Sequence, residues 1–118
     1  FSTLENLKIF ADIRGIVFNK ERVDYLLDKF LLYKRKDDLL KTYSSGMKQR
    51  AKFIFALMHS PQLLVLDEPT SNLDEEGKSS VYEIVKEESK TNIVIIASNE
   101  RNDLELCSEI LLLEKYKN

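Results

Sequence analysis

Cysteine pairs, long apolar runs and an excess of one charge are all missing from this sequence of 118 residues, and each absence excludes a class of protein. The single cysteine, Cys107, rules out an internal disulfide and fits a reducing compartment. No apolar run approaches the ~20 residues needed to span a bilayer, and no signal-peptide pattern stands at the start. A formal net charge of −2 provides no basic excess, so we expect no nucleic-acid partner.

Glycine is also scarce, and this excludes one kind of phosphate site. A phosphate-binding loop of the form G-x-x-x-x-G-K-[ST] needs two closely spaced glycines followed by a lysine. The three glycines, Gly15, Gly46 and Gly77, are more than thirty residues apart. Gly77 precedes Lys78 and Ser79, but the residue five positions before it is Asn72 and not the first glycine that the motif needs. The sequence therefore contains no such loop.

What is present is the composition of an ordinary globular protein, with 43% hydrophobic and 32% charged residues. The length fits one modest domain or a piece of a larger one. The chain starts at Phe1, and its first ten residues resemble the middle of a domain. We therefore expect a piece of a longer protein.

The first forty residues are predicted to be helical. Ser2 and Glu5 have the spacing of a capping box, and Gly15 is a suitable helix end. A second helix is expected from about Asn19, because apolar residues follow it at helical intervals. The charged run at residues 34–38 is interpreted as a solvated bend or a short helix.

From Ser44 onward the pattern changes to alternating helices and strands. Near-continuous apolar strands between helices favour a parallel sheet in an α/β layer, with its ligand site at the carboxyl ends of the strands. We expect the strand at 63–66 to be covered on both faces. The expected helices are 45–58, 74–89 and a turn around 104–107, and the expected strands are 63–66, 92–98 and 109–114.

One of these strands ends on two adjacent carboxylates, Asp67 and Glu68, in the stretch "LLVLDEPTSNLD". Burying an unpaired charge is costly, so two neighbouring charges at a strand end need an explanation. One carboxylate can hold Mg²⁺ while the other polarises an attacking water. The dipeptide alone is equally consistent with a strand followed by an acidic turn.

A second motif lies upstream, in "YSSGMKQR" at Tyr43–Arg50. Its small residues lead directly into a helix, whose free backbone N–H groups and positive end suit an anion such as phosphate. The simpler alternative is that Ser44 only caps the helix. Downstream, "SNLD" at Ser71–Asp74 is likewise open to interpretation as a loop and a helix cap.

Taken in order, "YSSGMKQR", "LLVLDEPTSNLD" and "IIASNE" resemble the second half of an ATP-binding-cassette (ABC) ATPase. The first resembles the signature motif of that family, with Tyr43 for leucine, Ser45 for the first glycine and Met47 for glutamine. "LLVLDEP" matches the Walker B strand and "SNLD" the D-loop, while "TLENLKIFADIRG" is similar to the start of the helical subdomain.

The resemblance implies a fold and a division of the chain. The fold would be a partial P-loop NTPase-like (RecA-like) α/β core with a parallel sheet, preceded by an α-helical subdomain. Residues 1–42 would form that subdomain, and residues 43–118 would carry the signature helix, Walker B strand, D-loop and switch region.

The resemblance also implies cofactors, ATP and Mg²⁺, and a role for each matching residue. Asp67 would hold Mg²⁺ through water, and Glu68 would be the general base for the hydrolytic water. Asp74 would line a dimer interface. The γ-phosphate of ATP held by a second subunit would be contacted by the signature residues Ser44, Ser45, Gly46 and Met47.

Two departures from the family pattern qualify this picture. Asn99 stands where the family usually has a switch histidine; asparagine can donate one hydrogen bond to a phosphate but carries no positive charge. The only histidine, His59, is expected to be a surface residue rather than a replacement. Because the phosphate loop is missing as well, the chain alone is expected to be inactive.

The leading interpretation is the ATP-hydrolysing subunit of an ABC transporter. It would act as a homodimer or a heterodimer of ATPase subunits, with residues 1–42 contacting a transmembrane permease. It would then be cytoplasmic and peripheral to the inner face of the membrane. Two alternatives stay open: a soluble ABC ATPase acting on ribosomes or DNA, and a non-catalytic interaction module. The lack of sustained heptads before Tyr43 counts against a chromosome-type member.

Overall fold

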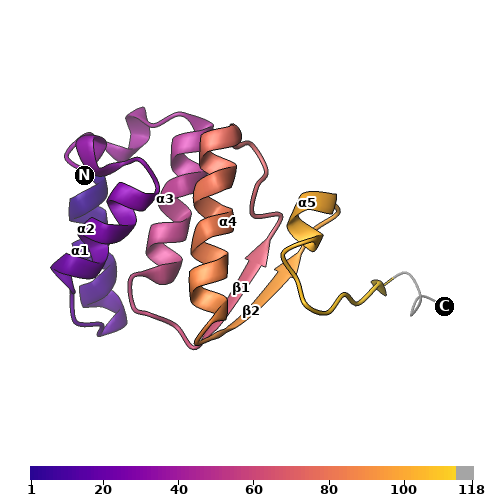
Figure 1. The fold of residues 1–118 in the computed structure, drawn as a ribbon. Coiled ribbons are helices and arrows are strands. Elements are labelled where there is room, and N and C mark those ends of the chain that lie inside the picture. Colours follow the sequence, from indigo (N-terminus) through magenta and orange to yellow (C-terminus); the bar gives the residue numbers. More distant parts are fainter. Residues whose placement is uncertain (114–118) are drawn as a thin grey trace.

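The computed structural model describes residues 1–113 and contains a helical part followed by an α/β part (Figure 1). Helices α3 and α4 lie between the first two helices and the strands (Figure 1). The elements in chain order are α1 (Thr3–Arg14), α2 (Lys20–Lys29), the 3₁₀ turns η1 (Tyr33–Arg35) and η2 (Leu40–Thr42), α3 (Ser45–Leu57), β1 (Leu63–Asp67), α4 (Glu75–Ser89), β2 (Ile93–Ala97) and α5 (Arg101–Leu104).

Local signals in the sequence determine where the first two helices begin and end. Ser2 and Glu5 form the predicted capping box at the start of α1, each side chain bonding to the other's backbone N–H. Gly15 ends α1 in the left-handed region at φ 66°, which glycine adopts without steric cost. The Asn19 side chain caps α2 as expected.

The sheet consists of two parallel strands, β1 and β2, paired from Leu63 with Ile93 to Asp67 with Ala97. This confirms the predicted parallel arrangement and places both carboxyl ends at the same edge of the sheet. The expectation that the strand at 63–66 is covered on both faces is wrong for the described residues. One face, with Leu64 and Leu66, is buried. The other face leaves Leu63 53%, Val65 61%, Ile93 65% and Ile95 51% exposed.

The predicted strand at 109–114 is not confirmed. Residues 109–113 form no strand, and Glu114 lies outside the described residues. The apolar side chains from Ile110 to Leu113 are all more than half exposed. An apolar run matches the strand pattern, but a strand also needs a neighbour to bond with, and none of the described residues pairs with it.

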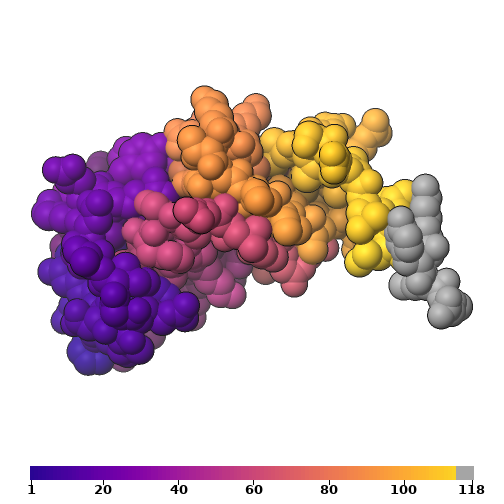
Figure 2. All heavy atoms as spheres, turned by 90° about the horizontal axis from the view of Figure 1, so that it is seen from below, coloured from indigo at the N-terminus to yellow at the C-terminus, as the bar shows by residue number. Residues whose placement is uncertain are grey.

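One apolar core joins the helical part to the α/β part. The rings of Phe30, after α2, and Phe53, in α3, stack with their centroids 5.2 Å apart. Arg22 of α2 contacts both α3 and α4: its guanidinium donates to the Leu57 carbonyl in α3 and pairs with Glu88 in α4. The body measures 46 × 29 × 27 Å, with the α1–α2 region at one end and the β2–α5 segment toward the other (Figure 2).

Across residues 1–113, no helix has the length and apolar character needed to cross a membrane. The boundary predicted between residues 42 and 43 stays a prediction.

Candidate functional site

The two adjacent carboxylates lie where the sequence predicts, at the carboxyl end of β1. Asp67 is the last residue of the strand, and the ladder continues by one bond from the Glu68 N–H to the Ala97 carbonyl at 2.8 Å. Glu68 itself has φ 45°, in the left-handed region that side-chain-bearing residues rarely adopt. The chain therefore turns sharply between the two acids.

This turn separates the two carboxylates. Asp67 is exposed at the end of the uncovered face that carries Leu63 and Val65, whereas Glu68 is half-buried beside the loop that follows. Adjacent residues on an extended strand also face opposite sides. Glu68, by contrast, has a left-handed backbone, and its side chain bonds to the segment that follows β2.

Glu68 is held against the segment that follows β2. Its Oε1 accepts a hydrogen bond from the Asn99 N–H at 3.2 Å, and its Oε2 lies 3.4 Å from the Ser98 hydroxyl. The structure thus brings together Glu68 and Asn99, two candidates that are 31 positions apart. The contact uses the Asn99 backbone, and the residue itself is exposed.

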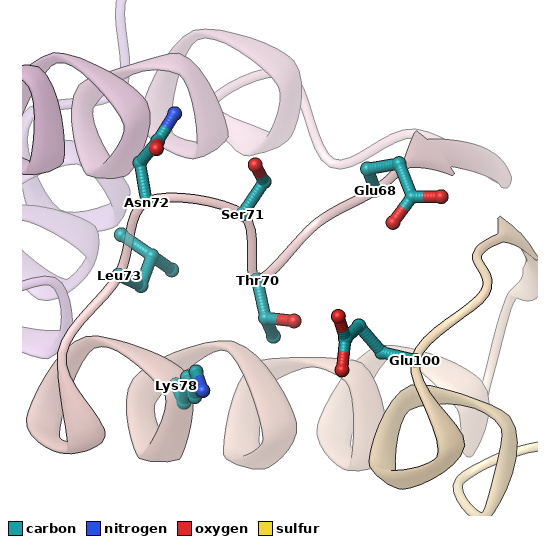
Figure 3. Close-up of a pocket in the computed structure, with 7 residues that line it drawn as sticks. All are labelled: Glu68, Thr70, Ser71, Asn72, Leu73, Lys78 and Glu100. Atoms are coloured by element: carbon teal, nitrogen blue, oxygen red, sulfur yellow. The ribbon is translucent and has the colours of Figure 1, made fainter.

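Glu68 also lines a pocket of about 250 Å³ between the loop after β1 and helix α4. Figure 3 shows Glu68 and Glu100 at one side of this pocket and Lys78 projecting from α4. The pocket is lined by Glu68, Thr70, Ser71, Asn72, Leu73, Lys78 and Glu100.

The site contains a group that sequence reasoning missed, the buried carboxylate of Asp103 on α5. Asp103 is 0% exposed and accepts hydrogen bonds from the hydroxyls of Thr70, Ser98 and Tyr82. Burial raises the pKa of Tyr82, and its hydrogen bond to Asp103 raises that pKa further. The only sequence signal was the position of Asp103, five residues after Ser98 at the same sheet edge.

The segment Tyr43–Arg50 contains the start of helix α3. The helix cap expected at Ser44 is confirmed, while a contact with phosphate stays a prediction. Ser44 caps α3, its hydroxyl accepting from the Met47 N–H at 3.1 Å. Ser44 and Ser45 are exposed, so the first turn of α3 is open to solvent. Met47 is half-buried and packs against the core.

The same helix start lies against the loop at Ser71–Asp74. A Cβ added to Gly46 would lie 3.2 Å from the Asn72 carbonyl oxygen, so a larger residue would press on that loop. Asn72 has φ 63°, a second left-handed position in the loop after β1. Gly46 therefore permits a close approach between two segments that are both predicted site elements.

Asp74 caps helix α4, with its Oδ1 accepting from the Gly77 N–H at 2.9 Å. The helix-cap alternative for this aspartate is thus confirmed, while a role at a dimer interface stays a prediction. Arg50 donates to the Phe30 carbonyl at 3.0 Å, which supports α3 from α2. His59 is exposed, as expected.

Within the described residues, no group of three or more His, Cys, Asp or Glu side chains is arranged to hold a metal ion. A single carboxylate such as Asp67 still suits Mg²⁺, which commonly uses one or two protein carboxylates together with water and substrate phosphates. Glu68, a carboxylate that lines the pocket, has the chemistry of a proton acceptor.

Comparison with known proteins gives matches over nearly the whole chain. The family model described as ABC transporter matches residues 2–71. The uncharacterized ABC transporter ATP-binding protein YdbJ of Bacillus subtilis (strain 168) is 36% identical over 114 residues, covering 94% of this chain and 37% of the relative. The bacitracin transport ATP-binding protein BcrA of Enterococcus faecalis is 37% identical over 109 residues, covering 91% of this chain and 35% of the relative.

A more distant relative and a solved structure agree with these matches. ABC transporter A family member 8 of Dictyostelium discoideum is 29% identical over 114 residues, covering 95% of this chain and 14% of the relative. A solved structure, that of an ATP-binding subunit of an ABC transporter, superimposes with a TM-score of 0.74 at 23% identity, covering 89% of this chain and 45% of that one. The fold is therefore that of an ABC ATP-binding subunit, and the chain spans less than half the length of these relatives.

Proposed function

The chain belongs to the ABC transporter family, and from this premise we propose that it forms part of a subunit that binds and hydrolyses ATP to drive transport. The observation that carries the proposal is the hydrogen bond that joins Glu68 to the segment of Asn99. Glu68 follows strand β1, and Asn99, the residue at the proposed switch position, follows strand β2.

In the proposed mechanism Glu68 is the general base. Its Oε1 is held by the Asn99 N–H, and Glu68 lines the pocket, so a water bound there could pass a proton to its carboxylate. The orientation is fixed before substrate arrives, because the carboxylate is bonded to backbone rather than to a mobile side chain.

Asp67 is proposed to hold Mg²⁺ through water, and the ion, when bound, neutralises charge on the phosphates. Exposure of Asp67 at the strand end supports this role, since a second ligand set from ATP would have access to it.

The signature residues are proposed to contact the γ-phosphate of ATP bound by a second subunit. Ser44, Ser45 and Gly46 form the open first turn of α3, where unpaired N–H groups and the helix dipole favour an anion. Met47 would take part only through its place in the first turn of α3, because its N–H bonds to the Ser44 hydroxyl and its side chain packs against the core. Asp74 would lie at the same dimer interface.

The subunit would pair as a homodimer or a heterodimer of ATPase subunits and act on a transmembrane permease. We propose that residues 1–42 contact that permease, which would put the protein on the cytoplasmic face of the membrane. The phosphate-binding loop of each site would come from sequence outside this chain, because this chain contains none.

The test is Glu68→Gln in the full-length protein. Removing the base should lower ATP turnover by about 100-fold or more while ATP binding persists, so that ATP-bound dimers accumulate in size-exclusion chromatography. Glu21→Gln, the same exchange at an exposed residue of α2, is the matched control and should behave like the parent.

Equal turnover of the Glu68→Gln variant and the parent would contradict the proposal. If neither protein hydrolyses ATP nor forms ATP-dependent dimers, the non-catalytic interaction module becomes the better hypothesis. ATPase activity that responds to ribosomes or DNA, with no permease partner, would instead favour the soluble ABC ATPase.

A further inference from the structure

The buried carboxylate of Asp103 has no part in the mechanism proposed above, yet it contacts the same Ser98 hydroxyl as Glu68 does. Its Oδ1 accepts from the hydroxyls of Thr70 at 2.9 Å and Tyr82 at 3.1 Å, and its Oδ2 accepts from Ser98 at 2.8 Å. These donors come from the loop after β1, helix α4 and the end of β2. Asp103 thus ties together the three segments that surround Glu68.

The Ser98 hydroxyl lies between two carboxylates and has one proton to donate. It is 2.8 Å from Asp103 Oδ2 and 3.4 Å from Glu68 Oε2. The shorter contact is a good charge-assisted hydrogen bond, and the longer one is at the limit of any hydrogen bond. The Ser98 proton therefore belongs to Asp103. The Ser98 oxygen meanwhile accepts from the Glu100 N–H at 2.9 Å, which fixes the hydroxyl in place.

We propose that Asp103 is a positioning residue for Glu68: by taking the Ser98 proton, it keeps Glu68 Oε2 free to accept a proton from water. This inference rests on the proposed function. As the water oxygen bonds to the γ-phosphorus and the bond to the ADP oxygen breaks, the water proton passes to Glu68 Oε2. A proton already donated there by Ser98 would occupy the oxygen and stabilise its charge, making it a poorer acceptor.

Asp103→Asn in the full-length protein changes this arrangement with little change in shape. The amide oxygen can keep the Thr70 and Tyr82 bonds, while the amide nitrogen donates to the Ser98 oxygen. The Ser98 proton then turns toward Glu68. We expect kcat for ATP hydrolysis to fall by about ten-fold or more, with KM for ATP changing by less than about two-fold, because an interaction made only during reaction is affected.

A double-mutant cycle separates positioning from mere structural support. Ser98→Ala removes the proton for which the two carboxylates compete, so Asp103→Asn should cause no further loss of kcat in the Ser98→Ala background. Tyr82→Phe, which removes a donor from the other Asp103 oxygen, should lower kcat by less than about two-fold. A purely structural Asp103 would give the same loss with and without Ser98, and this outcome would overturn the inference.

Failure of the inference and failure of the proposed function give different results. If the parent hydrolyses ATP and Asp103→Asn matches it, the inference is overturned and the function stands. If the parent does not hydrolyse ATP, the crystal structure of the Asp103→Asn protein decides. The inference expects Ser98 Oγ and Glu68 Oε2 to approach to about 2.7 Å. A separation that stays near the present 3.4 Å overturns it.

Discussion

Asn99 is the residue at which this chain departs most clearly from its family in the proposed chemistry. Its backbone holds Glu68, but its exposed side chain offers one amide donor where an imidazole would offer a charged one. We predict that Asn99→His in the full-length protein raises kcat for ATP several-fold, because a cationic ring stabilises charge on the γ-phosphate better than a neutral amide.

The matched control is Asn102→His, which makes the same exchange at another exposed asparagine, in α5. Its turnover should equal that of the parent. Equal turnover of the Asn99→His protein and the parent would show that this position does not limit the reaction.

At the same scale, the sequence predicts some site residues and misses others for a clear reason. Asp67 and Glu68 stand out because two adjacent charges end an apolar run, a pattern visible in twelve residues. Asp103 looks like an ordinary polar residue of a short helix. Its burial arises only when Thr70, Ser98 and Tyr82 converge on it from three separate segments, and no local pattern encodes that convergence.

At the scale of the elements, one side chain of helix α2, Arg22, bonds to both α3 and α4. The Arg22 guanidinium donates to the Leu57 carbonyl at 3.3 Å and pairs with Glu88 at 2.7 Å. The Glu88 side chain is only 8% exposed, and its other oxygen accepts from the neutral Asn92 amide at 2.8 Å, so its counter-charge comes from Arg22. We predict that Arg22→Met lowers the free energy of unfolding by about 2–4 kcal/mol, because it leaves a buried carboxylate without its counter-charge.

Lys20→Met is the control for that measurement, by denaturant unfolding. Lys20 pairs with Asp24 in an exposed i,i+4 bridge, and such pairs contribute about 0.3–0.5 kcal/mol. Similar losses in the two variants would show that Arg22 acts only as a surface charge.

Helix starts were more predictable than strands, because a helix cap depends on residues close in sequence and a strand depends on a distant partner. Ser2, Asn19, Ser44 and Asp74 each cap a helix through a bond to a residue three positions later, so the signal lies within a short window. Residues 109–113 have the composition of a strand, but pairing depends on a neighbour elsewhere in the chain, which the pattern does not report.

At the scale of the whole molecule, we propose that the ATP site is divided between this chain and sequence outside it. The chain carries the acidic strand end and the signature turn, and it contains no phosphate-binding loop. We predict that titration calorimetry of the 118-residue chain with ATP and Mg²⁺ detects no binding, whereas the full-length protein binds. Micromolar binding by the chain alone would mean that it cradles phosphate by another route, and the residue roles proposed here would need to be reassigned.

One face of the sheet, with Leu63 and Val65, is exposed in the whole described structure. A sheet in an α/β fold normally has both faces covered, which is why the strand at 63–66 was expected to be buried on both sides. On one side of the sheet β1 is buried and β2 is half-buried, and on the other side both strands are exposed. This difference depends on which elements of the described residues pack on each side. Sequence composition alone could not report this.

At position 68 the left-handed backbone favours glycine, whereas the site needs a carboxylate. A residue with a side chain costs about 1–2 kcal/mol in that conformation, and glycine would occupy it freely. A chain selected only for thermal endurance would therefore place glycine directly after Asp67. Such a chain would lose the carboxylate that Asn99 holds, so at this one position robustness and turnover are rival goals.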